Sequence, residues 1–420
     1  MIAEVVTVGN EVLSGRTLDT NFAALARLLE ESGAKVAWHQ TVPDVADAIA
    51  AALQTALRRA RLVVLTGGLG PTPDDLTRKA VAQALNRPLS LDAEILEALR
   101  RRWEARGGRQ PMPASNEQQA LLPRGAQAVA NPIGSAPGLL IELDEQAVFV
   151  LPGVPEEMEA MARAAVAPWV TGRAARPVEY LTLRTTGIWE SVLAERIGDA
   201  AALLPGCGLA YLPGLSGVDV RVALPTGESA DPAAARERAR AALAERIGPY
   251  VYAEGEETLE QVVGRLLLER GWSIAVAESC TGGLVAGRLT AVAGSSSYFE
   301  SGVVCYSNAA KVRLAGVRST LIARHGAVSE PVARALARGV AKKREVPVGV
   351  GVTGIAGPTG GTPEKPVGTV HVACVTPDGE RHRELRLAGT RRMVRERSVA
   401  AALELVRRAL LGLPEPPRPN

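Results

Sequence analysis

The sequence predicts an α/β protein built from a doubly wound parallel sheet, a small α+β module and a second α/β domain. Three observations predict this class. The 420 residues exceed one ordinary domain. Strand-length apolar runs alternate with helical runs up to about residue 170, and the alternation then stops as far as residue 253. Finally, 47% hydrophobic and 22% charged residues are typical of a folded globular chain.

These features also predict where the domains begin and end. We expect a first domain at residues 1–170, a linker module at 171–253, a second α/β domain at 254–413 and a disordered tail at 414–420. The last seven residues, PEPPRPN, are a terminal segment with little to bury, which is why we expect disorder there.

The first domain alternates strand and helix from residue 2 onward. Its expected elements are strand 2–9, helix 21–33, strand 35–42, helix 45–60, strand 61–68 and helix 74–85. Continuous apolar strands separated by helices are typical of a parallel sheet covered on both faces. Ligands of such sheets gather at the carboxyl ends of the strands, where this chain places polar, glycine-bearing stretches.

The glycine-rich run GGLGPTPDDLT could bind phosphate. Its glycines lead into a helix whose first turn is expected to carry Asp74 and Asp75. Backbone amides at such a turn can surround phosphate oxygens while a carboxylate holds a divalent metal. The same residues could instead cap the helix, with Thr72 or Asp74 as the N-cap and a second acid favouring the helix dipole. The residues alone leave both interpretations open.

The middle module mixes helices and short strands without the parallel-sheet rhythm. The motif GLSG, residues 214–217, lies between two predicted strands, so we expect a hairpin turn there. We interpret the module as a spacer or a dimerisation element. Residues 254–272 are then expected to form an amphipathic helix that leads into the last domain.

The last domain contains a serine followed by a glycine pair. The apolar run 273–277 predicts a buried strand and residues 284–292 a helix, so Ser279 is expected in a strand-to-helix turn. There its hydroxyl would be exposed, with amides of the helix start directed toward it, while Gly282 and Gly283 permit positive φ. A serine in this position can cap a helix or attack an electrophile.

Tyr306 and Lys311 follow the next predicted strand, residues 302–305. A lysine with a lowered pKa can accept the serine proton, and a phenol can relay or orient it. The alternative is a half-buried tyrosine and a solvated lysine. The loop 353–366, rich in Gly, Pro and Thr, is longer than a connector needs and indicates ligand binding.

Composition argues against several classes of function. The net charge is +3 and no block of Lys or Arg stands out, so there is no electrostatic case for nucleic-acid binding. The four cysteines are scattered, which argues against a disulfide framework or zinc site; Cys280 is a rival nucleophile in principle. No apolar run approaches the roughly 18 residues of a membrane helix, and Glu4 interrupts the first apolar run, so we expect no signal peptide and a cytoplasmic protein.

The blocks ESCTGG, GSSSYFESGVVCYSNAAK and VTGIAGPTGGTPEKPVGTV, in this order, resemble the C-terminal domain of the CinA family over about residues 255–412. The resemblance implies hydrolysis of nicotinamide mononucleotide (NMN) to nicotinic acid mononucleotide and ammonia, without a cofactor. It implies that Ser279 is the nucleophile and that Tyr306 and Lys311 activate it. The substrate-binding residues it implies are Thr281, Gly282, Gly283, Thr353, Gly354, Gly357, Arg391 and Arg395, with Arg391 toward the phosphate.

Residues 1–168 resemble the molybdopterin-binding-like domain of the same family, and the middle module resembles its KH-type fold. The first resemblance implies metal-dependent hydrolysis of the pyrophosphate in ADP-ribose. It implies substrate contacts at Gly9, Asn10, Glu11, Gly67, Gly68 and Gly70, a further matched glycine at Gly153, and divalent-metal ligands among Asp74, Asp75 and Glu156.

The resemblance also implies a homodimer. Relatives of the first domain bind molybdopterin without this activity, so fold does not decide function. Two alternatives therefore stay open. One is a competence- or DNA-damage-linked binding protein without turnover, and the other is a degenerate first domain kept as a scaffold.

Overall fold

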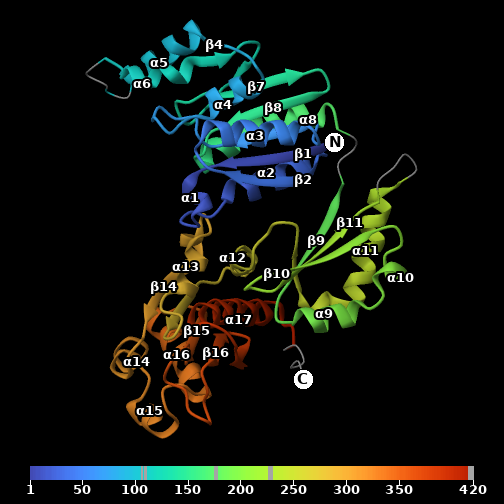
Figure 1. Cartoon of the computed structure of the whole chain (residues 1–420). Coiled ribbons are helices and arrows are strands. Elements are labelled where there is room, and N and C mark those ends of the chain that lie inside the picture. The colour runs from blue at the N-terminus through green and yellow to red at the C-terminus, as the bar shows by residue number, and fades with distance from the viewer. Residues whose placement is uncertain (106, 108–110, 175–177, 226–229, 415–420) are drawn as a thin grey trace. The chain divides into compact units, whose positions relative to one another are not determined.

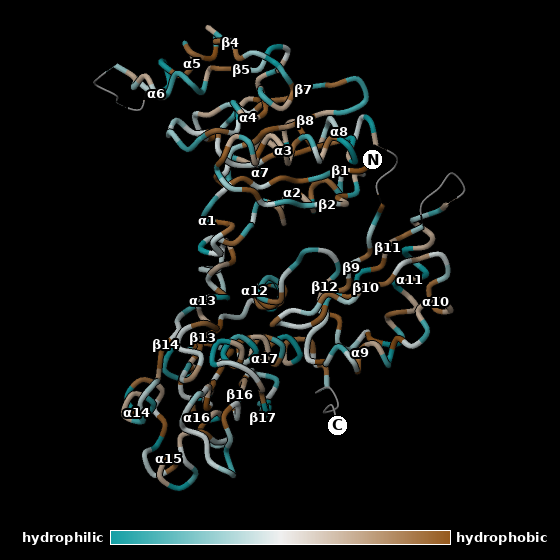
Figure 2. Tube along the Cα trace, viewed as in Figure 1, coloured by the Kyte–Doolittle hydropathy of each residue, from teal (hydrophilic) through white to brown (hydrophobic). Residues whose placement is uncertain are grey.

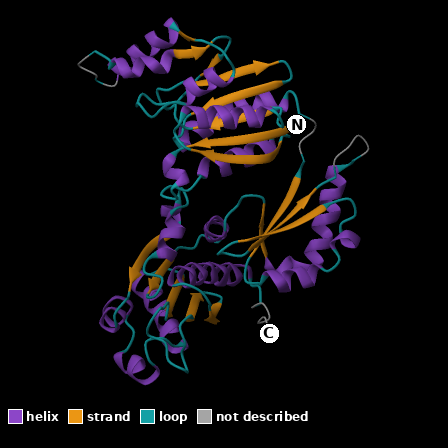
Figure 3. Ribbon diagram, in the orientation of Figure 1, coloured by secondary structure: helices purple, strands orange, loops and turns teal. Residues whose placement is uncertain are grey.

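The computed structural model describes residues 1–105, 107, 111–174, 178–225 and 230–414. Apart from Pro414, the tail expected to be disordered lies outside the described residues. The chain divides into two compact units, residues 1–179 and 180–420. Figure 1 shows the elements of each unit, and Figure 3 distinguishes the helices from the strands.

The first unit contains a six-stranded sheet of order β2-β1-β3-β8-β7-β6. Strands β1, β2, β3 and β8 are parallel, while β7 and β6 run antiparallel at one edge. Figure 2 shows β1 mostly in hydrophobic colours, in keeping with its buried sequence. The strands are β1 Ile2–Val8, β2 Lys35–Val42, β3 Leu62–Thr66, β6 Gln127–Val129, β7 Gly138–Leu143 and β8 Gln146–Leu151, with a separate pair β4 Leu89–Leu91 and β5 Leu121–Pro123.

Helices cover both faces of this sheet, as the alternating pattern predicts. One hydrophobic core packs α3 and α4 on one face, and another packs α2, α7 and α8 on the other. The predicted doubly wound architecture is therefore confirmed. The helices are α1 Asn10–Leu13, α2 Thr20–Glu31, α3 Ala46–Leu57, α4 Thr77–Ala84, α5 Ala93–Ala105, α6 Ala114–Glu117, α7 Pro155–Met161 and α8 Ala167–Thr171.

The helix expected at 74–85 begins later than predicted, at Thr77. The carboxylate of Asp75 accepts hydrogen bonds from the amide and the hydroxyl of Thr72, and this closes a turn ahead of the helix. Asp74 and Asp75 therefore precede α4 and do not form its first turn. Neither Thr72 nor Asp74 is the N-cap, because Leu76 holds that position.

The second unit begins with a four-stranded antiparallel sheet of order β10-β11-β9-β12. The predicted hairpin at 214–217 joins β10 to β11, and the Gly214 amide donates to the Gly217 carbonyl at 2.8 Å. The elements are β9 Tyr180–Thr185, α9 Glu190–Ile197, α10 Ala200–Leu203, β10 Gly208–Pro213, β11 Val218–Ala223, α11 Pro232–Ile247 and β12 Val251–Glu254.

The rest of the second unit is a five-stranded sheet of order β14-β13-β15-β16-β17, parallel in its first three strands and antiparallel in its last two. Its core packs α12, α13 and α17 on one face and α14, α15 and α16 on the other. The strands are β13 Ile274–Glu278, β14 Phe299–Val304, β15 Val348–Gly354, β16 Thr369–Thr376 and β17 Gly379–Arg386. The helices are α12 Leu259–Glu269, α13 Leu284–Thr290, α14 Asn308–Ala315, α15 Ser319–His325, α16 Glu330–Arg344 and α17 Arg391–Leu411.

The amphipathic helix expected at 254–272 is present as α12, and a capping box of Thr258 and Gln261 starts it. Within the part of the chain that the structure describes, none of the helices combines the length and apolar character needed to cross a bilayer.

Candidate active site

Ser279 lies directly after β13, in the strand-to-helix turn that the sequence predicts. Its amide donates to Val352 of β15 at 3.0 Å, and its carbonyl accepts from Gly282 at 3.1 Å. Gly282 and Gly283 have φ values of 61° and 96°, conformations that glycine adopts without strain. The turn therefore holds Ser279 at the carboxyl edge of the sheet, where β13 and β15 end side by side.

Lys311 reaches Ser279 from α14. Its side chain is only 2% exposed, and Nζ lies 3.0 Å from Ser279 Oγ. The same nitrogen donates to the main-chain carbonyls of Cys305, at 3.0 Å, and Tyr306, at 3.1 Å. The alternative of a solvated lysine is therefore wrong. Serine and lysine side chains that lie 32 residues apart in the sequence form one buried pair.

Burial lowers the pKa of Lys311, because an ammonium group loses its hydration inside the protein; the nearby thiols of Cys305 and Cys280 oppose this only in part. Among the described residues, no carboxylate forms an ion pair with Lys311. Burial raises the pKa of Cys280 to about 12. The thiol beside Ser279 is therefore not a competing nucleophile.

Tyr306 differs from both expectations. The residue is 60% exposed, so it is not half-buried. Its hydroxyl accepts a hydrogen bond from Arg391 Nη2 at 3.0 Å. Its contact with the buried pair of Ser279 and Lys311, called the dyad below, is made by its main-chain carbonyl, which accepts from Lys311 Nζ. Among the described residues, the hydroxyl of Tyr306 bonds Arg391 and forms no hydrogen bond with Ser279 or Lys311, so the expected phenol relay is not formed in this arrangement.

The two predicted arginines come from the start of α17 and bind backbone around the turn. Arg391 Nη1 donates to the Gly357 carbonyl at 2.8 Å, and Arg395 Nη2 donates to the Thr281 carbonyl at 2.8 Å. The hydroxyl of Thr281 is fully buried and, like Arg395 Nε, has no hydrogen-bond partner among the described residues. The structure therefore gathers Thr281, Gly282, Gly357, Arg391 and Arg395 around the serine turn.

Thr353 and Gly354 belong to β15 and not to the loop that follows it. Thr353 is 1% exposed, and its hydroxyl donates to the Ala327 carbonyl at 2.8 Å. A side chain at Gly354 would overlap Val370 of the neighbouring strand. The hydroxyl proton of Thr353 thus already bonds the backbone, which leaves the oxygen as the group that could accept from a substrate, and Gly354 meets a packing requirement.

Glu278 is a residue that the motif analysis missed. Its carboxylate is 1% exposed and accepts from three amides at the start of α13: Gly283 at 3.0 Å, Val285 at 3.1 Å and Ala286 at 2.8 Å. We expected such amides to point toward Ser279, and this expectation was wrong. A charged residue at the end of an otherwise apolar strand was the available signal, since a buried carboxylate requires partners.

In the first unit, glycines bring the ends of three strands close together. A side chain at Gly67 would lie 2.2 Å from the Val8 carbonyl, and one at Gly153 would lie 3.3 Å from Gly67. Gly67 and Gly68 have positive φ values of 108° and 66°. The backbone segments at the ends of β1, β3 and β8 thus pack closely against one another at the carboxyl edge of the sheet.

Polar side chains tie this edge together. Asn21 Nδ2 donates to Thr66 Oγ1 at 2.9 Å and to the Gly153 carbonyl at 2.8 Å, a role that the sequence did not reveal. The Asn10 amide donates to the Asp44 carboxylate at 2.8 Å, and a side chain at Gly9 would collide with the Glu11 carboxylate. A side chain at Gly70 would likewise meet Asp75. Several predicted contacts therefore already have protein partners.

The predicted metal ligands do not assemble into one site. Among the described residues, no three His, Cys, Asp or Glu side chains gather in a way that could hold a metal ion. Asp75 bonds Thr72, and α7 separately carries Glu156 in its first turn. A three-carboxylate site of Asp74, Asp75 and Glu156 does not fit this arrangement.

Comparisons with known proteins cover nearly the whole chain. Residues 4–172 match a family described as a probable molybdopterin binding domain, residues 181–253 the damage-inducible protein CinA KH domain, and residues 256–410 the CinA C-terminal domain. A CinA-like protein of Gemmatimonas aurantiaca is 45% identical over 413 residues, which span 97% of this chain and 96% of the relative. A putative competence-damage inducible protein of Symbiobacterium thermophilum is 45% identical over 425 residues, 98% of this chain and 99% of the relative.

Solved structures resemble parts of the chain. A crystal structure of CinA from Thermoplasma acidophilum, described as of unknown function, is 37% identical with a TM-score of 0.37, over 40% of this chain and 96% of that one. A competence/damage inducible protein from Agrobacterium tumefaciens is 39% identical with a TM-score of 0.35, over 37% of this chain and 97% of that one.

Proposed function

Because the chain belongs to the CinA family, we propose that its C-terminal domain is a serine amidohydrolase that converts NMN to nicotinic acid mononucleotide and ammonia. One observation carries the proposal: a serine hydroxyl in a strand-to-helix turn lies 3.0 Å from a buried lysine amine whose pKa is lowered. This pairing is what activation of a weak nucleophile requires.

The hydrogen bonds around Lys311 favour its role as a base. A charged lysine donates three hydrogen bonds and accepts none, whereas the neutral amine donates two and accepts one. Two of the three partners of Lys311 are main-chain carbonyls, which can only accept. In the neutral state both amine hydrogens therefore go to these carbonyls, and the lone pair is left for the hydroxyl hydrogen of Ser279.

The reaction then follows in two balanced steps. Ser279 Oγ attacks the carboxamide carbon while its proton passes to Lys311 Nζ. The lysine returns that proton to the departing nitrogen, which leaves as ammonia, and an acyl-serine remains. Water next attacks the acyl carbon and gives a proton to Lys311, and the proton returns to Ser279 Oγ as the acid is released.

The surroundings of the dyad support a substrate of this shape. Arg391 is exposed and lies beside the turn, so its remaining N–H groups can bind a phosphate. Tyr306 is exposed, its hydroxyl is bonded to the same guanidinium, and its main-chain carbonyl contacts the amine of Lys311. An aromatic face in this position suits a flat, positively charged pyridinium.

Substitution of the nucleophile tests the proposal. Ser279→Ala should reduce ammonia release from NMN by roughly 10³-fold or more, as expected when a covalent nucleophile is removed. The measurement is coupled ammonia detection with purified full-length protein. Thermal melting of the variant serves as the folding control, and ammonia release near the wild-type rate would contradict the nucleophile assignment.

For the first unit we propose hydrolysis of ADP-ribose to AMP and ribose 5-phosphate. The positive φ values of Gly67 and Gly68 support this, because glycine turns of this kind can direct backbone amides toward phosphate oxygens. Arg78, only 5% exposed, also brings a cation to this region and donates to the Leu69 and Pro137 carbonyls at 2.8 Å. Both substrates contain parts of NAD, so one salvage role would explain the fusion.

The expected divalent metal is a separate question for experiment. Asp74→Asn and Asp75→Asn should each lower AMP formation from ADP-ribose by about 10-fold or more if these carboxylates bind metal or substrate. The assay follows AMP with and without added divalent ions. Unchanged metal-dependent turnover in both variants would rule out these carboxylates, and no turnover in the wild type would favour a non-catalytic first unit.

A further inference from the structure

The carboxylate of Glu278 accepts hydrogen bonds from most of the backbone amides at the start of α13. The first amides of a helix have no partner within it and normally attract a side chain, water or an anion. Here the carboxylate takes Gly283, Val285 and Ala286, while the Leu284 amide is directed to the Thr281 carbonyl at 3.4 Å. Gly283, the N-cap residue, has no side chain that could do this.

The main chain of Glu278 is fixed as firmly as its side chain. Its carbonyl accepts from the Cys305 amide at 2.6 Å, which joins it to the segment after β14. The next amide, of Ser279, donates to Val352 of β15. Glu278, the last residue of β13, thus connects this strand to two further segments. Its side chain binds the start of α13, and its carbonyl binds Cys305, just after β14.

The charge of this carboxylate has no cationic partner. In the described part of the chain, no Lys, Arg or His forms an ion pair with Glu278. The carboxylate is instead satisfied by backbone amides at the positive end of the helix dipole. An anion in this position disfavours binding of a second anion at the same amides, so a substrate phosphate is better placed near Arg391.

We propose that Glu278 is a positioning residue for the deamidase reaction: its buried carboxylate closes the Ser279 turn against α13 and so directs Oγ toward Lys311. The inference rests on the proposed amidohydrolase function. Loss of the carboxylate would free three amides and let the glycine turn relax, while Arg391 and Tyr306, the side chains proposed to bind the phosphate and the pyridinium ring, would stay in place.

Glu278→Gln tests this, because glutamine keeps the size but offers one acceptor oxygen and an NH₂ group that faces an amide donor. We expect kcat for NMN to fall roughly 10- to 100-fold, since a shift of about 1 Å in a reacting group can cost this much. KM should change less than about threefold, because the altered contact does not involve Arg391 or Tyr306.

Glu404→Gln is a matched control. Glu404 is also 1% exposed, in the same domain, but it pairs with Arg407 Nε at 2.7 Å and Arg408 Nε at 2.6 Å in α17. This variant should lose thermal stability without loss of kcat at a temperature well below its melting point. An equal loss of kcat in both variants, or a rise in KM alone for Glu278→Gln, would overturn the positioning role.

A second readout does not depend on the natural substrate. A fluorophosphonate probe labels activated serines, and its rate of reaction with Ser279 should be lower in Glu278→Gln than in the wild type and in Glu404→Gln. Equal labelling rates in all three proteins would overturn the inference. If the wild type is labelled at Ser279 but releases no ammonia from NMN, the proposed substrate is wrong while the role of Glu278 still stands on the labelling rates.

Discussion

Lys311 reaches Ser279 because of where its helix begins. The Ser307 hydroxyl accepts from the Ala310 amide at 3.1 Å and caps α14. Lys311 therefore follows one turn later, on the buried side of the helix. The two carbonyls that bind its amine belong to Cys305 and Tyr306, in the segment that joins β14 to α14. The residues from the end of β14 to the first turns of α14 thus supply both Lys311 and the two carbonyls that orient its amine.

The geometry of Tyr306 predicts that its ring matters more than its hydroxyl. In Tyr306→Phe the main-chain carbonyl on Lys311 and the exposed ring remain, and only the hydrogen bond from Arg391 is lost. We expect kcat/KM for NMN to fall only roughly 2- to 10-fold, the effect of losing one solvent-exposed hydrogen bond. Tyr306→Ala should raise KM more strongly.

Steady-state kinetics of both variants check this. A proton relay through the phenol would instead make Tyr306→Phe about 10²- to 10⁴-fold slower in kcat. Such a loss, with the melting temperature unchanged, would contradict the arrangement in which Arg391 holds the hydroxyl.

The conformation and contacts of a residue could be predicted from the sequence where its neighbours in the chain determine them. The turn at Ser279 with positive φ at Gly282 and Gly283 follows from local backbone requirements. The partner of the Tyr306 hydroxyl, Arg391, lies 85 residues away on α17, and no local pattern reveals such a contact. The same applies to Thr353, whose hydroxyl meets Ala327 of a distant segment.

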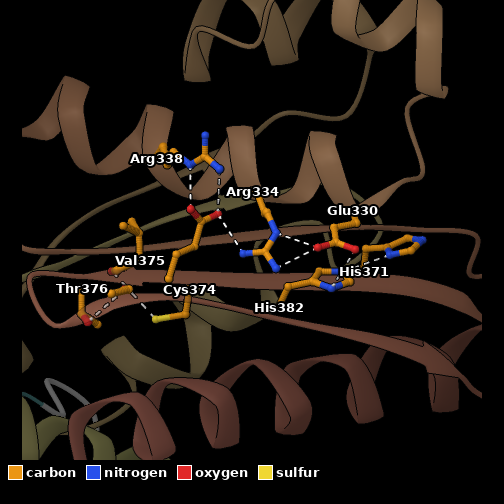
Figure 4. A network of polar contacts seen from close by, with 10 residues as sticks. Glu330, Arg334, Arg338, His371, Cys374, Val375, Thr376 and His382 are labelled. Atoms are coloured by element: carbon orange, nitrogen blue, oxygen red, sulfur yellow. Dashed lines mark hydrogen bonds and ion pairs between the residues drawn. The ribbon is translucent and has the colours of Figure 1, made fainter. Parts of the chain in front are cut away.

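At the scale of elements, α16 is held to β16 and β17 by a polar network (Figure 4). Arg334 pairs with Glu330 at 2.8 Å and with Glu380 at 3.3 Å, and Arg338 pairs with Glu380 at 2.8 Å. Beside them His371 Nδ1 and His382 Nε2 lie 3.1 Å apart. The network joins one face of the helix to the antiparallel edge of the sheet.

The histidine pair predicts acid sensitivity of this edge. Burial lowers the pKa of both His371 and His382, although the carboxylates of Glu330 and Glu384 oppose the shift while Lys365, Arg334 and Arg386 favour it. At acidic pH these two histidines therefore bind protons more readily in the unfolded chain than in the folded chain. Their contribution to stability is complete above the ordinary histidine pKa of about 6.5 and is lost as pH falls below it.

Thermal melting at about pH 7.5 and pH 5.5, either side of the ordinary histidine pKa, checks this prediction. The wild type should lose more stability on acidification than a His371→Asn/His382→Asn variant, at about 2–4 °C of melting temperature per kcal/mol. An identical pH dependence in both proteins would show that other groups control acid stability.

Elements were predictable where periodicity is strong and less so at their ends. The alternating apolar runs correctly predicted β1, β2, β3 and the helices between them. The start of α4 was wrong by three residues, because the Thr72–Asp75 turn competes with the helix for the same acidic residues. The antiparallel pair of β7 and β8 is joined by only two residues, 144 and 145, and so short a connection excludes a parallel pair; the expectation of a parallel sheet did not use this length.

At the scale of the whole molecule, the chain joins two sheet-based units that each present glycine turns at the carboxyl ends of parallel strands. The middle module contains GLSG at residues 214–217, which matches the GxxG pattern that clamps nucleic acid in KH domains, but here these residues form a hairpin turn between β10 and β11. This geometry favours the enzyme proposals over a nucleic-acid-binding role, which a filter-binding assay at two salt concentrations can examine directly.

Family resemblance and strand alternation together predicted this architecture well, because each domain carries its own strongly patterned core. The metal site was the exception. Asp74, Asp75 and Glu156 share a suitable chemistry, but sequence spacing cannot say whether carboxylates from separate segments meet, and within the described ranges no three potential ligands gather.

The sulfur beside the nucleophile has a practical consequence. Cys280 is 4% exposed and its pKa is raised to about 12, so almost none of it is thiolate at neutral pH. Iodoacetamide and hydrogen peroxide act on accessible thiolates, and this turn offers them none. Under the proposed function, we therefore expect ammonia release from NMN to survive treatment with iodoacetamide or hydrogen peroxide.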